Sequence, residues 1–436
     1  MKLRMNEVAA QNDRHPSVTR ARIALLATVA VVTMLSGCAQ TGGSSDGAVT
    51  LTYSIWDAPQ KAATQQMIDA FEKTNPNIHV QLSVVPWTDY WTKLQTAATG
   101  GSAPDIFWMN TPNLPKYANG GVLMPLSDRF ASDKVDMSQF AKAPVASATF
   151  DGKVYGMPKD VDALALWYNK AIFQAAGVPL PTDTWTWQDM VTAAQALTDS
   201  ATGVYGIPAL VTDQLSYYNT IPQSGGHVIS SDGTKSGYDD PKTIAGIQAW
   251  VDLIQKYHVS PTLQQMTDTD PTQMFESGKL AMTFAGSWLI PVLTTDPNVK
   301  DDLGVVQMPL ISQRGGVSNS VSNVVFAKTK HADAAVKFVE FLGTKQAATI
   351  EAKSGVLPAM TSAQQTWASS LPPSVDAQVF IETVAKNTPF PRSLDTSVWE
   401  TIATNEFSKA WSGDESVDDA AKSVATQMNA ALAAEK

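Results

Sequence analysis

The most informative segment of the chain is residues 151–177, D-G-K-V-Y-G-M-P-K-D-V-D-A-L-A-L-W-Y-N-K-A-I-F-Q-A-A-G. It opens with Asp151 and Gly152, which predict a tight turn because glycine tolerates positive φ and aspartate can hydrogen-bond its own backbone. A short extended run follows. Gly156 and Pro158 are expected to interrupt this run, since proline cannot donate a hydrogen bond to a strand ladder.

The second half of the segment predicts a new strand and a new helix. Residues 163–168 are apolar, which is typical of a buried strand. Residues 170–176 predict a helix, and Gly177 is expected to stop it. A carboxylate, Asp162, lies in the irregular passage just before the buried strand. The chain therefore leaves one strand, makes an irregular passage and starts a second strand–helix unit.

Strands and helices alternate on both sides of this segment. The apolar spacing and the positions of glycine and proline define each element. Such alternation predicts a mostly parallel sheet with helices on its faces. Strands are expected at 49–55, 78–85, 105–109, 204–207, 280–284, 303–308 and 323–327, and helices at 60–74, 87–98, 186–198, 241–257 and 331–342.

Composition narrows the class of function. The chain has 436 residues, which allows two or three domains, and a hydrophobic content of 44% that is ordinary for large cores. Its net charge of −10 argues against nucleic acid and against an anionic membrane surface as partners. The histidines show no metal-ligand spacing, and no phosphate loop or G-x-S-x-G motif occurs. The sequence therefore predicts no metal and no cofactor.

The N-terminus is typical of a bacterial lipoprotein. A basic region precedes an apolar run at 23–35 that is too short for a comfortable transmembrane helix. The tetrapeptide L-S-G-C at 35–38 matches a lipobox, and Cys38 is the only cysteine of the chain. We expect a signal peptide at 1–37, a lipid on Cys38, and a flexible Gly/Ser-rich tether within 38–48. Two lipid chains suffice for anchoring, so the mature chain is expected outside the cytoplasm, anchored to the bacterial membrane.

The segment at 151–177 resembles the family 1 extracellular solute-binding proteins, the sugar receptors of ABC importers. Its G-K-x-Y-x-x-P at 152–158, followed by L-x-Y-N-K at 166–170, matches the passage that carries that family's chain from its first lobe to its second. The order W-D, F-E-K-x-x-P-x-I-x-V and P-D-I between residues 56 and 106 is also similar to the N-terminal signature of the family. Each of these short motifs alone is weak evidence for the family, whereas their occurrence in this order is specific to it.

The resemblance implies an α/β fold of the periplasmic-binding-protein type II, with two α/β lobes joined by a hinge that the chain crosses several times. Residues 313–319 would form a second crossing and residues 355–358 a third. The implied N-terminal lobe comprises 49–159 and 322–362. The implied C-terminal lobe comprises 160–321 and 363–436.

Tryptophan is the side chain that points most directly to a ligand. The chain has 12 tryptophans, several of them expected at strand-to-helix junctions, such as Trp56 after the first strand. An indole covers the apolar face of a sugar ring, while carboxylate and amide side chains bind its hydroxyls. The resemblance implies ligand contacts at Asp57, Trp108, Asn110, Asp162, either Tyr217 or Tyr218, Trp288, Asn323, Arg392 and Trp399.

The sequence thus predicts a monomeric, lipid-anchored receptor that binds a neutral sugar between its lobes and delivers it to an ABC permease. A secreted glycoside hydrolase or lyase remains an alternative, although no stretch selects two catalytic carboxylates. A receptor for a peptide, a polyamine or glycerol phosphate is a second alternative. The candidate positions carry mainly tryptophan, aspartate and asparagine rather than clustered arginine and lysine, which favours a neutral sugar.

Overall fold

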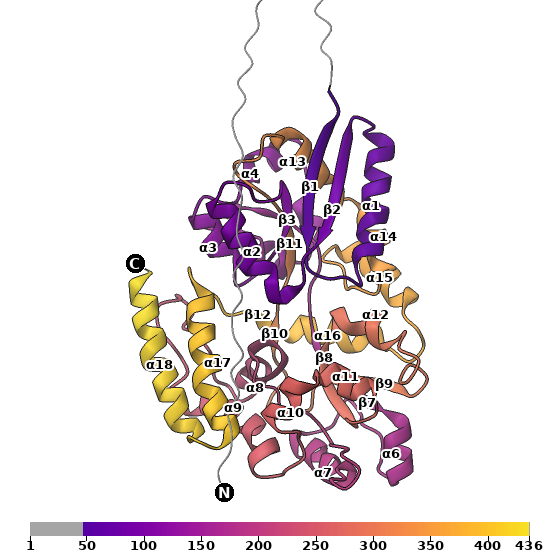
Figure 1. Cartoon of the computed structure of the whole chain (residues 1–436), viewed down its shortest axis with the longest axis vertical. Helices are drawn as coiled ribbons and strands as arrows, with labels where there is room; N and C mark the ends of the chain where they lie inside the picture. Colours follow the sequence, from indigo (N-terminus) through magenta and orange to yellow (C-terminus); the bar gives the residue numbers. More distant parts are fainter. Residues whose placement is uncertain (1–46, 436) are drawn as a thin grey trace, which may run out of the picture. The chain divides into compact units, whose positions relative to one another are not determined.

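The computed structural model describes residues 47–435, which fold into two α/β lobes (Figure 1). The expected signal peptide, Cys38 and the tether up to residue 46 lie outside the described residues. Among the helices of residues 47–435, none has both the length and the hydrophobicity of a membrane span.

The N-terminal lobe is built on a five-stranded sheet in the order β2-β1-β3-β11-β6. Strands β1 (Val49–Ile55), β2 (Ile78–Val84) and β3 (Ile106–Asn110) are parallel. Strand β11 (Val321–Val325) is antiparallel to both β3 and β6 (Gly156–Pro158). The sheet therefore joins the first third of the chain to a segment that returns much later in the sequence.

Helices pack on both faces of this sheet because its central strands alternate between two cores. Along β3, Ile106 and Trp108 belong to one hydrophobic cluster, and Phe107 and Met109 belong to another. The first cluster includes residues of α1 and α13, and the second includes residues of α2 and α3. The helices of this part of the chain are α1 (Lys61–Thr74), α2 (Trp87–Thr99), α3 (Leu114–Asn119), α4 (Ser127–Ser132), η1 (Met137–Gln139), α5 (Lys142–Ser147), α13 (Ala332–Leu342) and α14 (Lys345–Ala352).

The C-terminal lobe contains a three-stranded sheet in the order β8-β7-β9. Strand β7 (Leu164–Asn169) is antiparallel to both β8 (Met282–Gly286) and β9 (Leu303–Gln307). The expectation of a mostly parallel sheet is therefore wrong for this lobe. Alternation requires parallel strands only where one short helical crossover joins neighbours, whereas several helices separate β7 from β8.

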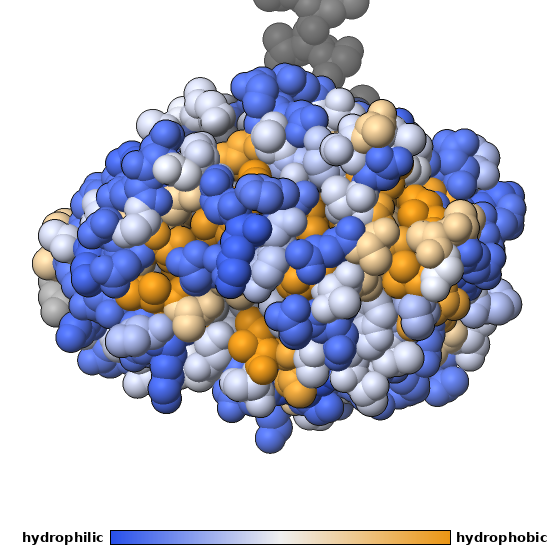
Figure 2. Space-filling view, turned by 90° about the horizontal axis from the view of Figure 1, so that it is seen from below, coloured by the Kyte–Doolittle hydropathy of each residue, from blue (hydrophilic) through white to orange (hydrophobic). Residues whose placement is uncertain are grey.

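Helices surround this second sheet and supply most of its core. The yellow C-terminal pair α17 and α18 packs beside α9 (Figure 1). The face seen in Figure 2 is mostly hydrophilic and carries separate hydrophobic patches. The remaining elements are β4 (Thr149–Phe150), β5 (Lys153–Val154), α6 (Lys170–Ala176), α7 (Trp187–Leu197), η2 (Asp213–Tyr217), α8 (Tyr218–Gln223), α9 (Pro241–Gln255), α10 (Leu263–Asp268), α11 (Pro271–Glu276), η3 (Ser287–Leu289), α12 (Ile290–Leu293), β10 (Val317–Ser318), α15 (Thr361–Ser370), α16 (Ala377–Lys386), β12 (Thr388–Pro389), α17 (Thr396–Ser412) and α18 (Val417–Ala434).

The segment at 151–177 folds largely as its sequence predicts. Asp151 and Gly152 turn the chain between β4 and β5 with positive φ, and Gly177 ends α6 in the left-handed region. One detail differs, because Gly156 and Pro158 form strand β6 rather than a break. β6 is the edge of its sheet, where the missing N–H of proline leaves no ladder bond unmade.

A second local difference concerns residues 204–207, which were expected to form a strand. They make only isolated bridges, such as that between Tyr205 and Leu280. The backbone at Gly206 is pressed against α7, where an added Cβ would lie 2.4 Å from the carbonyl oxygen of Ala194. This segment therefore packs on a helix instead of pairing along a sheet.

The chain passes between the lobes at three places that are hydrogen-bonded to one another. The backbone N–H of Lys159 donates to the carbonyl of Val321 at 2.9 Å. The N–H of Val161 donates to the carbonyl of Leu357 at 3.1 Å, and that of Ala359 donates back to Lys159 at 2.9 Å. These bonds join the passages at 159–162, 319–321 and 357–359 into one hinge.

Candidate functional site

A pocket of about 500 Å³ lies between the two lobes. Helices α2 and α3 and the end of β3 line it from the N-terminal lobe, and η2 and α17 line it from the other lobe. The lining residues are Trp87, Trp91, Thr92, Gln95, Thr96, Asn110, Pro112, Asn113, Lys116, Tyr117, Asp213, Gln214, Asn319, Phe390, Ser397 and Glu400.

Helix α2 supplies an aromatic wall to this pocket. Trp87 and Trp91 are one helical turn apart, so both indoles project from the same side of α2. The two rings meet edge to face with their centroids 5.6 Å apart, and each also contacts Trp56, which follows strand β1. Trp87 is 51% exposed, an unusual position for so large an apolar side chain. The wall is therefore pre-assembled and presents free indole surface to the pocket.

Amide side chains contribute polar groups to the pocket. Asn110 accepts a hydrogen bond from the side chain of Asn113 at 2.9 Å. The amide of Asn319 donates to Gln214 at 3.2 Å, and Gln214 in turn donates to Asp162 at 3.4 Å. These contacts orient the amides, which retain further donor and acceptor capacity for a bound molecule.

The charged groups of the pocket are largely neutralised. Asp213 and Glu400 lie close enough for the charge of Asp213 to act on Glu400. Burial, followed by the charge of Asp213, raises the pKa of Glu400 well above its usual range, and burial also raises the pKa of Asp213. Lys116, the basic residue of the lining, is paired with Asp395 at 3.0 Å. The pocket therefore presents hydrogen-bonding groups rather than a free cation.

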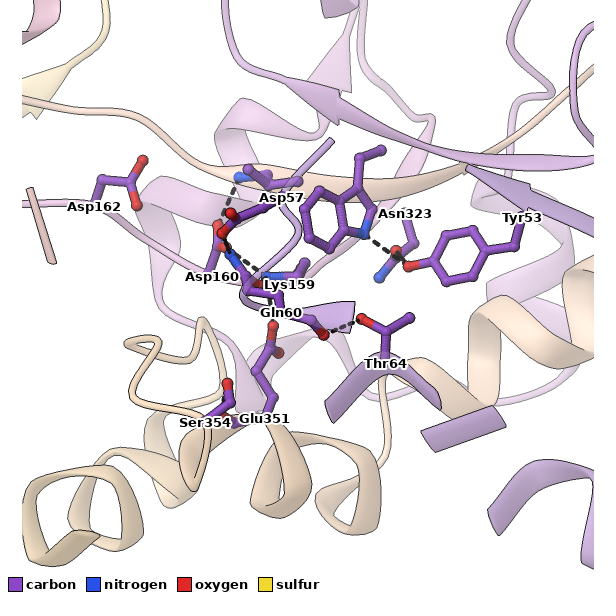
Figure 3. A network of polar contacts seen from close by, with 12 residues as sticks. Tyr53, Asp57, Gln60, Thr64, Lys159, Asp160, Asp162, Asn323, Glu351 and Ser354 are labelled. Atoms are coloured by element: carbon purple, nitrogen blue, oxygen red, sulfur yellow. Dashed lines mark hydrogen bonds and ion pairs between the residues drawn. The ribbon is translucent and has the colours of Figure 1, made fainter. Parts of the chain in front are cut away.

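A buried polar network lies at the hinge (Figure 3). At its centre the ammonium of Lys159 lies 2.6 Å from Asp160, 2.5 Å from Glu351 and 2.7 Å from the amide oxygen of Gln60. The same ammonium stands 4.6 Å from the ring centroid of Trp108. Burial opposes the charge on Lys159, but the two carboxylates prevail and raise its pKa above the usual value. The network thus joins the N-terminal lobe to the hinge around one cation.

Several of the predicted site residues belong to this network. The side chain of Gln60 donates to Asp57 at 2.7 Å. The indole N–H of Trp108 donates to the hydroxyl of Tyr53 at 2.7 Å, which donates to Asn323 at 2.6 Å. Burial and then the charge of Asp160 raise the pKa of Asp162. Asp162 accepts its hydrogen bond from Gln214, whereas the other groups satisfy one another around the hinge (Figure 3).

The family model of the bacterial extracellular solute-binding proteins matches residues 56–349. This chain belongs to that family. The chain is 26% identical over 357 residues to the diacetylchitobiose binding protein DasA of Streptomyces coelicolor, over 77% of this chain and 81% of DasA.

Solved structures of similar proteins share the whole fold of this solute-binding protein. One is the ABC substrate-binding protein Lmo0181 of Listeria monocytogenes in complex with cycloalternan, with a TM-score of 0.83 and 29% identity over 88% of this chain and 99% of that one. Another is the GacH receptor of Streptomyces glaucescens, solved unliganded and with acarbose, with a TM-score of 0.79 and 25% identity over 88% and 98% of the two chains. The type II two-lobed fold expected from the sequence is confirmed.

The solute-binding protein brings only part of the predicted set to the pocket. Asn110 lines it, Trp56 supports its aromatic wall, and Asp162 contacts it through Gln214. Asp57 lies in the hinge network, as do Trp108 and Asn323, which are only 1% and 3% exposed. Neighbouring side chains cover Trp108 and Asn323 in this structure, and the ligand contacts expected of them stay a prediction.

Three of the predicted aromatic residues of the C-terminal lobe are likewise buried. Tyr217, Tyr218 and Trp399 are at most 1% exposed and belong to the core of that lobe. Their rings pack on helix α17 and its neighbours, which leaves no face free for a ligand. Trp288 is half-buried and lies over Gly286, where a Cβ would come within 1.8 Å of its ring. It is not among the residues that line the pocket.

Arg392 is also engaged by protein groups. Its guanidinium donates to the carbonyls of Ala146, Ser147 and Thr149 at 3.0–3.1 Å. The carbonyls of Ala146 and Ser147 end helix α5 of the N-terminal lobe, and Thr149 begins β4 just after it. Phe390, beside Arg392, belongs to the core of the other lobe. Arg392 therefore joins the lobes instead of presenting its charge to the pocket.

The two most exposed aromatic residues of the site, Trp87 and Trp91, were not among the predicted ligand contacts. The helix that carries them was expected at 87–98, but no ligand role was assigned to it. The available signal was their spacing of four residues, which puts two indoles on one helix face. Asp213, Gln214 and Glu400 carried no local signal, because η2 and α17 meet only in the folded chain.

Proposed function

We propose that this solute-binding protein captures a neutral oligosaccharide in the pocket between its lobes. The observation that carries the proposal is the pair Trp87 and Trp91, whose indoles face the pocket beside the amides of Asn110, Gln214 and Asn319. Indole faces cover the C–H surfaces of sugar rings, and amides and carboxyls pair with hydroxyls that would otherwise be buried without partners. A pocket of about 500 Å³ falls in the range of ligand sites.

The charge of the pocket supports a neutral ligand over an anionic one. A phosphate or carboxylate would require a free arginine or lysine. Lys116 is paired with Asp395, and Arg392 is held by backbone carbonyls. The relatives whose names describe diacetylchitobiose, cycloalternan and acarbose ligands support the same class of molecule.

We infer that the lipid on Cys38 anchors a monomeric receptor to the outer side of the bacterial membrane, where it delivers the sugar to an ABC permease. The family is extracytoplasmic, which supports this location. The lobes would close over the sugar by hinge bending at the three passages, driven by the sugar's higher affinity for the closed form.

A thermal-shift screen tests the proposal. The chain from residue 39 onward would be heated with mono- and oligosaccharides, since a ligand that binds only the native state raises the melting temperature. We expect at least one neutral oligosaccharide to do so, and Trp91→Ala to weaken its binding by about 1–3 kcal/mol. Incubation with excess ligand should yield no products.

The matched control for Trp91→Ala is Gln95→Ala, one turn further along α2, which removes a polar lining residue without removing an indole. We expect it to have the smaller effect on affinity. The proposal would be contradicted if Trp91→Ala bound the sugar as tightly as the unmodified protein, or if incubation released shorter sugars.

A further inference from the structure

A short segment of the C-terminal lobe, residues 392–395, contacts the N-terminal lobe at two separate points. At its first residue, the guanidinium of Arg392 donates to backbone carbonyls at the end of α5 and the start of β4. At its last residue, the carboxylate of Asp395 lies 3.0 Å from the ammonium of Lys116 on α3. The segment therefore bridges the two lobes, and we call residues 392–395 the clasp.

The clasp lies beside the pocket between the lobes. Lys116 lines that pocket, and so does Ser397, two residues after the clasp. Phe390, two residues before the clasp, also lines the pocket and belongs to the core of the C-terminal lobe. Movement of the lobes apart would therefore break the contacts of the clasp and widen the pocket at the same time.

One carboxylate at the end of α18, which lies beside the start of α17 (Figure 1), holds the clasp in place. Glu435 accepts hydrogen bonds from the hydroxyl of Ser393 at 2.7 Å and from the backbone N–H groups of Leu394 and Asp395, both at 2.9 Å. Hydrogen bonds to a charged acceptor are roughly twice as strong as those between neutral groups. Glu435 therefore fixes the backbone of the clasp, although it does not itself line the pocket.

This support decides whether the contact between Asp395 and Lys116 can contribute. The side chains of Lys116 and Asp395 are 38% and 32% exposed, and an ion pair between such partly exposed, mobile groups contributes little by itself. Its contribution grows when one partner is already held in the bound geometry, because less conformational freedom is then lost. Asp395 precedes α17 with φ −128° and ψ 67°, outside the helix, so the hydrogen bond from its N–H to Glu435 supplies that restraint.

We propose that Glu435 is a positioning residue for ligand capture, which holds the clasp against the N-terminal lobe and so favours the form in which the lobes meet over the pocket. This inference rests on the lobe closure of the proposed function. Glu435 acts through Arg392 and Asp395, not by contact with the ligand. The contacts of the clasp exist only in the closed form, so that loosening the clasp shifts the population toward the open form.

The distance between the lobes measures this effect without any ligand. Cys38 is the only cysteine of the sequence, so the chain from residue 39 onward can be spin-labelled at two introduced cysteines. Asn119→Cys on α3 and Asn405→Cys on α17 place one label at an exposed position of each lobe. Double electron–electron resonance then separates a short distance in the closed form from a long one in the open form. Glu435→Ala should raise the open fraction at least about threefold.

Two further variants show whether the carboxylate itself is responsible. Glu435→Gln keeps one oxygen acceptor but places an NH₂ group where the other oxygen accepts from Leu394, so its open fraction should lie between those of the unmodified protein and Glu435→Ala. Asp418→Asn, at the other end of α18, removes a carboxylate that pairs with Lys422 on the same helix and should leave the distances unchanged. Circular dichroism checks that each variant is folded.

A double-mutant cycle separates positioning from a general loosening of α18. Asp395→Asn removes the ion pair with Lys116 but keeps the N–H that Glu435 accepts. Glu435→Ala should therefore raise the open fraction less in the Asp395→Asn background than in the unmodified protein, because the two residues act through the same contact.

The inference and the proposed function fail in different ways. An open fraction unaffected by Glu435→Ala, an equal effect of this substitution in both backgrounds, or a long distance alone in the unmodified protein would each overturn the role of Glu435. A thermal-shift screen in which no sugar raises the melting temperature would instead count against the proposed function, whatever distances the spin labels report.

Discussion

The ammonium of Lys159 lies 2.5 Å from the carboxylate of Glu351, and both side chains are buried at the hinge. Lys159 follows strand β6 on the first passage between the lobes, and Glu351 comes from α14 near the third. A second carboxylate, Asp160, accepts the N–H of Val321 at 3.0 Å and so ties the second passage to the same cation. One lysine therefore holds all three passages in register.

Removal of this cation should cost much of the stability of the fold. Lys159→Met keeps the length of the side chain but leaves Asp160 and Glu351 buried without a counter-charge. We expect the free energy of unfolding to fall by about 3–5 kcal/mol, as for other broken buried ion pairs. The free energy of unfolding is measured by urea denaturation, with tryptophan fluorescence as the signal.

The control for this variant is Lys153→Met, at an exposed lysine of β5. It should change the urea midpoint little, because surface substitutions away from special features usually have small effects. A Lys159→Met protein as stable as the control would show that the ion pairs contribute nothing net to the hinge.

The hinge should also make stability depend on pH. Burial, opposed by Lys159, raises the pKa of Glu351 from 4.5 to about 7. In the window from about pH 4.5 to about pH 7 the folded state holds more protons at this site than the unfolded chain, so this group's contribution to stability falls as pH rises. Glu351→Gln cannot ionise and should lose less stability between pH 5 and pH 8 than the unmodified protein. The free energy of unfolding of both proteins is measured by urea denaturation at each pH. If it changes with pH to the same extent in both proteins, this expectation is contradicted.

The fold could be predicted further than the site. The segment at 151–177 was interpretable because a turn, a buried strand and a glycine-stopped helix each depend on neighbouring residues. The buried position of Trp108 could not be predicted in this way. Its indole is covered by Tyr53, Asn323 and Lys159, which lie far from it in the sequence. The predicted lobe boundaries stay a prediction.

The difference between Trp91 and Trp399 makes the same point. Both are tryptophans on helices, and the family resemblance implied a ligand contact only for the second. Trp399 turned out to be fully buried and donates its N–H to Ser393 at 2.8 Å. Exposure depends on which helix faces pack together, and that is decided by contacts between elements rather than by local pattern.

The stacking role predicted for Trp288 stays a prediction and needs its own test. It follows the end of β8 and is half-buried, so its ring retains accessible surface. We expect Trp288→Ala to weaken oligosaccharide binding by about 1–3 kcal/mol without unfolding the protein. Isothermal titration with the best sugar from the screen measures the affinity, and circular dichroism checks the fold. Unchanged affinity would exclude Trp288 from the site while leaving Trp87 and Trp91 in it.

Arg392 should restrain the separation of the lobes. Its guanidinium reaches three carbonyls at the end of α5 and the start of β4, a geometry that the single ammonium of lysine cannot reproduce. In Arg392→Lys we therefore expect more open conformations and a larger radius of gyration in small-angle scattering without ligand. A saturating sugar should compact the variant more than the unmodified protein, because more of it starts open.

Arg129→Lys is the matched control, since Arg129 pairs with Asp333 on the surface of the N-terminal lobe alone. It should leave the radius of gyration unchanged. If Arg392→Lys behaves in the same way, the contact with α5 does not govern the opening of the lobes, and the restraint must come from the passages around Lys159. If both variants expand, the change reflects general loosening of the N-terminal lobe rather than release of a tether between the lobes.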